Sequence, residues 1–280
     1  MNKTSGSWSC QAQSEIDVTL QWATAAINRG RGEDAERLAR EVLARIPQHP
    51  KALDILGCAL LLQGRPEQAI APLERAARSR QDPAIETRLA VALRQIGRTD
   101  DALARVTRAT RRRPANAEAF GELGFQLFAL HRSDEAVKAI ERGLELLPDA
   151  PELWIQLGGI HHVRGDRVGG KAAYARALAI APDDAGAHYG LGAVLVDNAE
   201  FASAAEHLRR SLAANSGDVQ VRIKLGLCLL ELGRMEEALE HLRTAVGGNP
   251  RRYGSALKLL SSAGRGRFWL RPSVAKKMLS

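Results

Sequence analysis

The sequence has no long apolar run and only three cysteines. No stretch of its 280 residues reaches the roughly 18 consecutive apolar residues that a membrane-spanning helix needs, and residues 1–15 lack the apolar core of a signal peptide. Cys10, Cys58 and Cys228 are scattered rather than paired in spacing, so they indicate neither a disulfide framework nor a zinc site. We therefore expect a soluble chain in the reducing cytoplasm.

Aromatic residues make up only 4% of the chain, although 45% of it is hydrophobic. The buried surfaces must then consist mainly of Ala and Leu, which is typical of closely packed helices. The net charge of +8 is spread unevenly, with +6 over residues 1–115, −4 over 116–252 and +6 over 253–280. This distribution predicts acidic partners near the termini or self-association, and solvated helix faces are the alternative.

Prolines recur along the chain with a period of 34 residues. Pro114, Pro148, Pro182 and Pro250 stand one or two periods apart, and Pro47 keeps nearly the same register. This register divides the chain into seven segments: 16–49, 50–82, 83–116, 117–150, 151–184, 185–218 and 219–252. A fixed period of this length indicates a repeat protein, in which neighbouring repeats stabilise one another by stacking.

The aligned segments share small residues at two positions. The eighth residue is small in all seven: Ala23, Gly57, Ala90, Gly124, Gly158, Gly192 and Gly226. The twentieth is also small: Ala35, Ala69, Ala102, Ala136, Gly170, Ala204 and Ala238. Glycine inside a helix costs about 1 kcal/mol relative to alanine, so its recurrence indicates that two helices must approach closely there. The turn between those helices is expected at Gly64, Gly97, Gly165 and Gly233.

These residues resemble the tetratricopeptide repeat (TPR) pattern, for example in Phe120-x-x-Leu123-Gly124 followed by Ala136 and Pro148. The resemblance covers residues 16–252. It implies an all-α fold, a right-handed α-solenoid of about seven TPR helix-turn-helix repeats, which a C-terminal helix at 253–263 would cap. The other predicted parts are a disordered tail at 1–15 and a basic aromatic tail at 264–280. Arg outnumbers Lys by 32 to 8, as GC-rich coding favours, so we expect a bacterial source.

Signs of chemistry are present, but each has a structural interpretation that fits better. Residues 165–172 reproduce most of the spacing of a phosphate-binding P-loop, but Ala172 offers no hydroxyl to magnesium and no strand is expected before the glycines. His161, His162 and His188 have neither the spacing nor the acidic or thiol neighbours of a metal site. We therefore predict no catalysis, no metal and no cofactor.

Two basic stretches stand out. Arg108 with residues 111–113 ends the third segment, where cations suit a solvated helix end. Contact with nucleic acid or phosphate is the alternative, but no aromatic residues interleave with these arginines, so nucleic acid is not the expected partner. Phe268, Trp269 and Leu270 are expected to plug the end of the stack, and an anchor for an acidic partner or an anionic membrane is the alternative.

The resemblance also implies a ligand groove along the first helices of the repeats. Carried over by repeat position, the groove comprises Cys58, Leu62, Val91, Arg94, Phe125, Phe128, Ile155, His162, Tyr189, Val196, Leu227 and Leu230. Packing in the core is the alternative for each. Because the set is mostly apolar, we expect it to bind a peptide or helical segment, anchored at Phe125, Phe128 and Tyr189. The Lys and Asn pair of the carboxylate clamp is missing, so chaperone tails are not expected ligands.

The sequence therefore predicts a non-enzymatic protein–protein interaction scaffold or adaptor. The alternative is an accessory module of a separate transferase, or of an envelope or secretion assembly system, because many similar repeats work beside enzymes that act on peptides or glycans. Direct nucleic-acid binding is the third possibility.

Overall fold

The computed structural model describes the backbone of residues 5–247 and the side chains of residues 14–247. Within this range the chain is all-α and contains no strand. The helices are α1 (Ser5–Asn28), α2 (Gly32–Arg45), α3 (Pro50–Leu62), α4 (Pro66–Ser79), α5 (Pro83–Gln95), α6 (Thr99–Thr110), α7 (Ala117–Ala129), α8 (Ser133–Leu146), α9 (Pro151–Val163), α10 (Arg167–Ile180), α11 (Ala185–Asp197), α12 (Phe201–Ala214), α13 (Val219–Glu231) and α14 (Met235–Val246).

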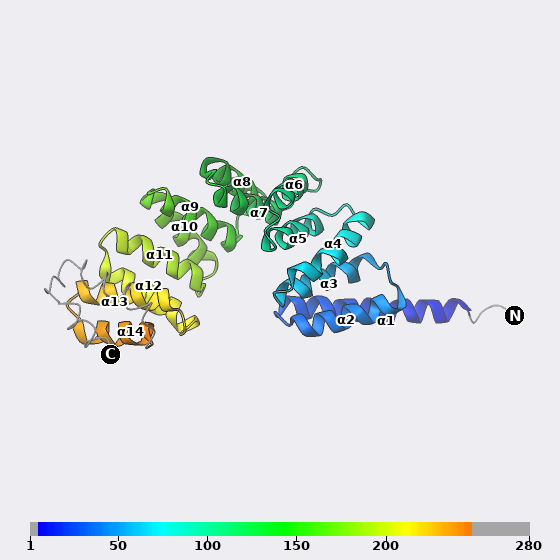
Figure 1. Cartoon of the computed structure of the whole chain (residues 1–280), viewed down its shortest axis with the longest axis horizontal. Coiled ribbons are helices and arrows are strands. Elements are labelled where there is room, and N and C mark those ends of the chain that lie inside the picture. Colours follow the sequence, from blue (N-terminus) through cyan, green and yellow to red (C-terminus); the bar gives the residue numbers. More distant parts are fainter. Residues whose placement is uncertain (1–4, 248–280) are drawn as a thin grey trace. The chain divides into compact units, whose positions relative to one another are not determined.

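The helices form an all-α solenoid built as two compact units, residues 1–146 (unit 1) and 147–280 (unit 2). Unit 1 contains α1–α8, and the described part of unit 2 contains α9–α14 (Figure 1). Inside each unit, successive helices pack against each other, and first helices of neighbouring repeats are also in contact, as α3 is with α5 and α11 with α13. First helices therefore line one side of each unit.

The turns inside the helix pairs need a residue in the left-handed conformation. The predicted glycines take it, with φ of +68°, +81°, +78° and +78° at Gly64, Gly97, Gly165 and Gly233. The fourth and sixth repeats place His131 and Ala199 there instead, with φ of 60° and 58°, although the left-handed conformation costs such residues roughly 1 kcal/mol. The turns thus keep one shape even where glycine is missing.

Packing within a repeat pairs the eighth residue with a bulky residue sixteen positions later. A methyl group added at Gly124 would overlap Ile140, and methyl groups at Gly192 and Gly226 would lie 2.9 and 2.8 Å from Leu208 and Leu242. Repeats with alanine at the eighth position carry a smaller residue sixteen positions later, either Ala39 or Val106. Each small residue on the first helix therefore makes room for a larger residue on the second helix, and the two sizes are matched.

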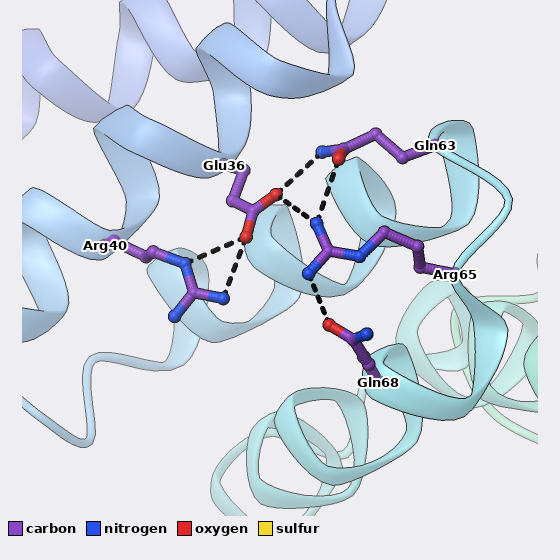
Figure 2. Close-up of polar contacts among 5 residues, drawn as sticks. All are labelled: Glu36, Arg40, Gln63, Arg65 and Gln68. Atoms are coloured by element: carbon purple, nitrogen blue, oxygen red, sulfur yellow. Dashed lines mark hydrogen bonds and ion pairs between the residues drawn. The ribbon is translucent and has the colours of Figure 1, made fainter.

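The first two repeats are also joined through Glu36 of α2, as Figure 2 shows. Its Oε1 accepts a hydrogen bond from Nε of Arg40 (2.9 Å) and forms an ion pair with Nη2 of the same residue (2.8 Å). Its Oε2 accepts from Nε2 of Gln63 and Nη1 of Arg65, each at 2.8 Å. The hydrogen bond from Gln63 contributes most to lowering the pKa of Glu36. Since Gln63 and Arg65 flank the α3–α4 turn, this carboxylate fixes α2 to that turn.

The structure differs from the prediction for one part of the chain, and two other predicted parts lie outside the described residues. The tail at 1–15 was expected to be disordered, but α1 begins at Ser5. Once the packed part of a helix has formed, each further residue adds a hydrogen bond, so the helix extends backward through a segment that contains no proline. The capping helix at 253–263 and the basic aromatic tail at 264–280 fall outside the described range.

Candidate functional site

In unit 1 the predicted ligand residues lie on α3, α5 and α7. Cys58 and Leu62 are on α3, Val91 and Arg94 on α5, and Phe125 and Phe128 on α7; we call these six residues the unit 1 face. Three of them occupy the ninth position of successive repeats, so they recur on the same side of stacked helices. Leu62 is 51% exposed and Phe125 44% exposed, whereas the other four are half-buried. The unit 1 face thus offers apolar surface to solvent.

Arg94 and Phe125 are in contact across neighbouring repeats. The guanidinium carbon of Arg94 lies 4.5 Å from the ring centroid of Phe125, a cation–π contact. Nε of Arg94 donates a 2.8 Å hydrogen bond to Oε1 of Glu122, which also accepts one from Nε2 of Gln126 at 2.8 Å. Because the side chain of Glu122 is only 10% exposed, this pair is well shielded from water. Glu122 therefore holds the guanidinium of Arg94 against the ring of Phe125.

A second ion pair joins α3 to α5. Nη1 of Arg88 lies 2.9 and 3.0 Å from the two carboxylate oxygens of Asp54. Burial raises the pKa of Asp54 above its usual value despite the attraction of Arg88. Burial also raises the pKa of the neighbouring Cys58 thiol to about 12. Cys58 is therefore a neutral thiol at physiological pH and a poor nucleophile.

In unit 2 the predicted ligand residues are more firmly packed. They lie on α9 (Ile155, His162), α11 (Tyr189, Val196) and α13 (Leu227, Leu230). Ile155, Tyr189, Val196 and Leu227 pack against the core cluster of this unit. Leu230 belongs to that core and is only 3% exposed, so it has almost no surface to offer a ligand. His162 makes a polar contact, because its Nε2 lies 2.7 Å from Oδ2 of Asp197 on α11.

The three histidines considered as metal ligands, His161, His162 and His188, each pair with a different residue. His161 contacts Asp166 at 2.8 Å, whereas His188 contacts His207 at 2.9 Å. Nowhere in the described range do three His, Cys, Asp or Glu side chains come together in a way that could hold a metal ion. Residues 165–172 form the α9–α10 turn and the start of α10, where the backbone N–H of Gly169 donates to Asp166. They follow a helix rather than the strand that a P-loop requires.

The prediction did not include Arg88 or Glu122 among the ligand residues, although both stand beside them. Asp54, Arg88 and Glu122 follow one another at intervals of 34 residues with alternating charge. Asp54 is the fifth residue of its repeat and the other two are the sixth residues of theirs. Such neighbouring positions on stacked repeats lie close together, so this pattern was a signal for ion pairs between repeats. Arg88 forms an ion pair with Asp54 of the preceding repeat, whereas Glu122 forms one with Arg94.

Comparisons with solved structures support the same fold. A chain of the APC/C hetero-tetramer Cut9-Hcn1 is similar with a TM-score of 0.77 at 18% identity, covering 89% of this chain; this chain spans only 49% of that one. A tetratricopeptide repeat protein from Parabacteroides merdae has a TM-score of 0.60 at 16% identity, covering 88% and 98% of the two chains. YrrB, described as a TPR protein with an unusual peptide-binding site, has a TM-score of 0.53 at 19% identity, covering 66% and 96%.

No curated protein is similar enough in sequence to count as a match. None of the helices in the described range is both long and apolar enough to cross a membrane. Two family models, each described as tetratricopeptide repeat, match the sequence: one at residues 20–84, 126–185 and 189–256, the other at 60–123. The first alone covers more than half of the chain. The chain therefore belongs to the tetratricopeptide repeat family and is a scaffold for protein–protein interaction.

Proposed function

We propose that this chain is a non-enzymatic adaptor, without a cofactor, that binds a peptide or helical segment of a partner protein on the unit 1 face. The observation that carries the proposal is the exposed ring of Phe125 with the guanidinium of Arg94 stacked on it. Aromatic residues and arginine dominate the binding energy of many interfaces, because they combine a large apolar area with directional polar contacts.

The geometry of this pair suits binding because its polar member is already fixed. Glu122 holds Arg94 over the ring, and Gln126 in turn holds Glu122. A ligand that covers Phe125 therefore loses little side-chain entropy on the protein side. The exposed Leu62 and the half-buried Val91 and Phe128 extend the apolar surface over three successive repeats, as a bound extended or helical segment would require.

Unit 1 is favoured over unit 2 as the main binding surface. Most of the corresponding residues of unit 2 pack on its core, and Leu230 is buried. The description of YrrB shows that a peptide-binding site occurs on a protein of this fold, which supports but does not place the site proposed here. The cytoplasm is the proposed compartment, because Cys58 and Cys228 are both free thiols.

Affinity capture with a matched pair of variants tests the proposal. Tagged wild-type chain and Phe125→Ala are used to purify partners from the native host, and co-purifying proteins are quantified by mass spectrometry. Leu146→Ala is the control, because Leu146 is a similarly exposed (46%) apolar residue of unit 1 that lies on the second helix α8. We expect Phe125→Ala to reduce capture of at least one partner about tenfold, the effect of roughly 1.4 kcal/mol, and Leu146→Ala to leave it unchanged. Equal capture by all three proteins would contradict the proposal.

A further inference from the structure

A hollow between two loops of unit 1 lies apart from the unit 1 face. Its volume is about 440 Å³. It is lined by residues 80–83, from the end of α4 to the start of α5, and by residues 113–116, from the α6–α7 loop. Both loops connect one repeat to the next. The hollow is within the size range of small-ligand sites, and none of its lining residues is aromatic.

The hollow has an excess of positive charge. Arg80 and Arg113 are exposed and stand at the same place, the thirty-first residue, in successive repeats. Neither forms an ion pair with a carboxylate in the described part of the chain, although Arg80 is near enough to Asp54 to favour its charged form. Nη1 of Arg113 has only a long contact, 3.4 Å, with the carbonyl oxygen of Arg112. Asp82, the acidic residue of the lining, accepts the backbone N–H of Ala84 at 2.9 Å as a helix cap.

Arg112 adds to this charge and joins the two loops. Its Nη1 donates to the side-chain oxygen of Gln81, which lies in the other loop. Its Nε is buried and has no acceptor. A guanidinium with an unused buried donor is unfavourable unless a further acceptor is nearby. The two loops are thus tied together while part of their donor capacity is left unused.

Cations beside other inter-repeat loops are used by the protein itself. Arg75 donates to the carbonyl oxygen of Pro47 and to Gln48 at the α2–α3 loop. Arg222 donates to the carbonyl oxygen of Ser216 at the α12–α13 loop, with distances of 3.1 and 2.6 Å. Arg80 and Arg113 thus differ from these arginines in having donors free for a ligand.

We propose that this hollow binds carboxylate side chains of an acidic segment in a partner protein. The planar guanidinium groups of Arg80 and Arg113 can each donate two parallel hydrogen bonds to a carboxylate. Acidic peptide is favoured over nucleic acid, because the lining has no aromatic side chain on which successive bases could stack. The site is separate from the unit 1 face, so one chain can hold two segments of a partner or two partners.

Fluorescence anisotropy with a fluorescein-labelled hexaglutamate peptide tests this proposal on the full chain. The variant is Arg80→Gln with Arg113→Gln. The control is Arg78→Gln with Arg142→Gln, which removes the same charge from exposed residues of unit 1 that pair with Glu74 and Glu145. We expect the first variant to weaken binding about tenfold or more, and the control to change it less than about twofold. Circular dichroism melting curves check that both variants are folded.

Three outcomes would overturn the proposal, and two further variants check it. No binding of hexaglutamate by the wild-type chain overturns it, and so does equal weakening by the two double variants, which would show a diffuse charge effect. Tighter binding of a single-stranded oligonucleotide than of hexaglutamate, lost in the Arg80 and Arg113 variant, overturns it in favour of nucleic acid. A charge-reversed variant, Arg80→Glu with Arg113→Glu, provides a second check, because it should lose hexaglutamate and gain hexalysine. Phe125→Ala should leave hexaglutamate binding unchanged. The proposal for this hollow and the proposal for the unit 1 face can therefore be contradicted independently.

Discussion

Both units are built from the same kind of repeat, but junctions between repeats in unit 1 and a junction in unit 2 use different chemistry at the same position. The sixth residue of a repeat illustrates this. In the third and fourth repeats, which belong to unit 1, it is Arg88 and Glu122, and each forms an ion pair with a residue of an adjacent repeat. In the sixth repeat, which belongs to unit 2, it is Gly190, and the ring of Tyr174 from the preceding repeat occupies the space where its side chain would be. A single backbone frame therefore accepts either charged pairs or close aromatic packing between repeats.

This difference has a consequence for binding. Ion pairs at the repeat junctions of unit 1 leave long, partly exposed side chains such as Arg94 near the apolar ring of Phe125. The aromatic packing of unit 2 buries Tyr174 and leaves Tyr189 packed on the core. Unit 1 thus has the more accessible mixture of polar and apolar groups, which is the composition that protein interfaces use.

Replacing Gly190 by alanine should produce the largest effect and should damage unit 2 selectively. The added methyl group would overlap the ring of Tyr174, which is also in close contact with Gly158 and therefore has little room to move. We expect a loss of about 3 kcal/mol in the free energy of unfolding, the upper part of the usual range for overpacking. Hydrogen exchange measured by mass spectrometry should show the loss in α9–α12 and little change in α2–α7.

Gly159→Ala is the control for that prediction. A methyl group there would lie 3.5 Å from the Tyr174 hydroxyl, an ordinary contact, so the higher helix propensity of alanine should stabilise the chain by up to about 1 kcal/mol. If Gly190→Ala were as harmless as Gly159→Ala, the close packing between repeats of unit 2 would not be what stabilises that unit. Adding Tyr174→Leu to Gly190→Ala should restore part of the loss.

The fold was predictable from the sequence because it depends on a repeated pattern. The glycines at the eighth position and in the turns are required by helix contact and backbone conformation, and neither requirement depends on distant residues. The candidate site was less predictable. Leu230 and Phe128 both fit an apolar ligand position, but exposure separates them, and exposure depends on what surrounding residues cover. The pairing of Arg94 with Glu122 likewise depends on rotamers that repeat spacing leaves open.

Breaking the Asp54–Arg88 pair should have the next largest effect and should act on unit 1. Arg88→Ala leaves the half-buried carboxylate of Asp54 without its partner. We expect a loss of about 2 kcal/mol in the free energy of unfolding, less than for a fully buried pair because a third of the Arg88 side chain is exposed. Chemical denaturation together with hydrogen exchange of α3 and α5 would measure this loss.

The double variant Asp54→Leu with Arg88→Leu sharpens the same prediction. Desolvation offsets much of the attraction in a buried ion pair, and burial raises the pKa of Asp54 although Arg88 is bound to it. Two apolar residues should therefore recover most of the stability that Arg88→Ala loses. If the double variant were as unstable as Arg88→Ala, the attraction within the ion pair would determine the stability of this junction. The cost of leaving the Asp54 carboxylate unpaired would then not explain the loss.

Mild acid should have the smallest effect and should weaken unit 2 before unit 1. Burial, followed by the nearby His188 and Arg210, lowers the pKa of His207, and Glu206 opposes this only in part. A histidine with a lowered pKa contributes stability above its unfolded pKa of about 6.5, and this contribution is lost as the pH falls through the folded value. Burial and Arg222 lower the pKa of His241 in the same unit. In unit 1, Glu36 has a lowered carboxyl pKa, so its contribution is lost only in stronger acid.

Hydrogen exchange at about pH 7.5 and pH 5.5, corrected for intrinsic exchange rates, should therefore show α11, α12 and α14 loosening first. His207→Gln removes one of the two titrating groups, and it should reduce the difference between the two pH values in α11 and α12 while leaving α14 as in the wild type. The geometry of the His188–His207 pair supports the assignment of this effect in α11 and α12 to His207. Nε2 of His188 lies 2.9 Å from the carbonyl oxygen of Pro182 and must donate to it, so in the neutral pair the Nδ1 of His188 accepts from His207. Equal loosening of both units at pH 5.5 would show that acid acts on the whole chain through its net charge instead of through these imidazoles.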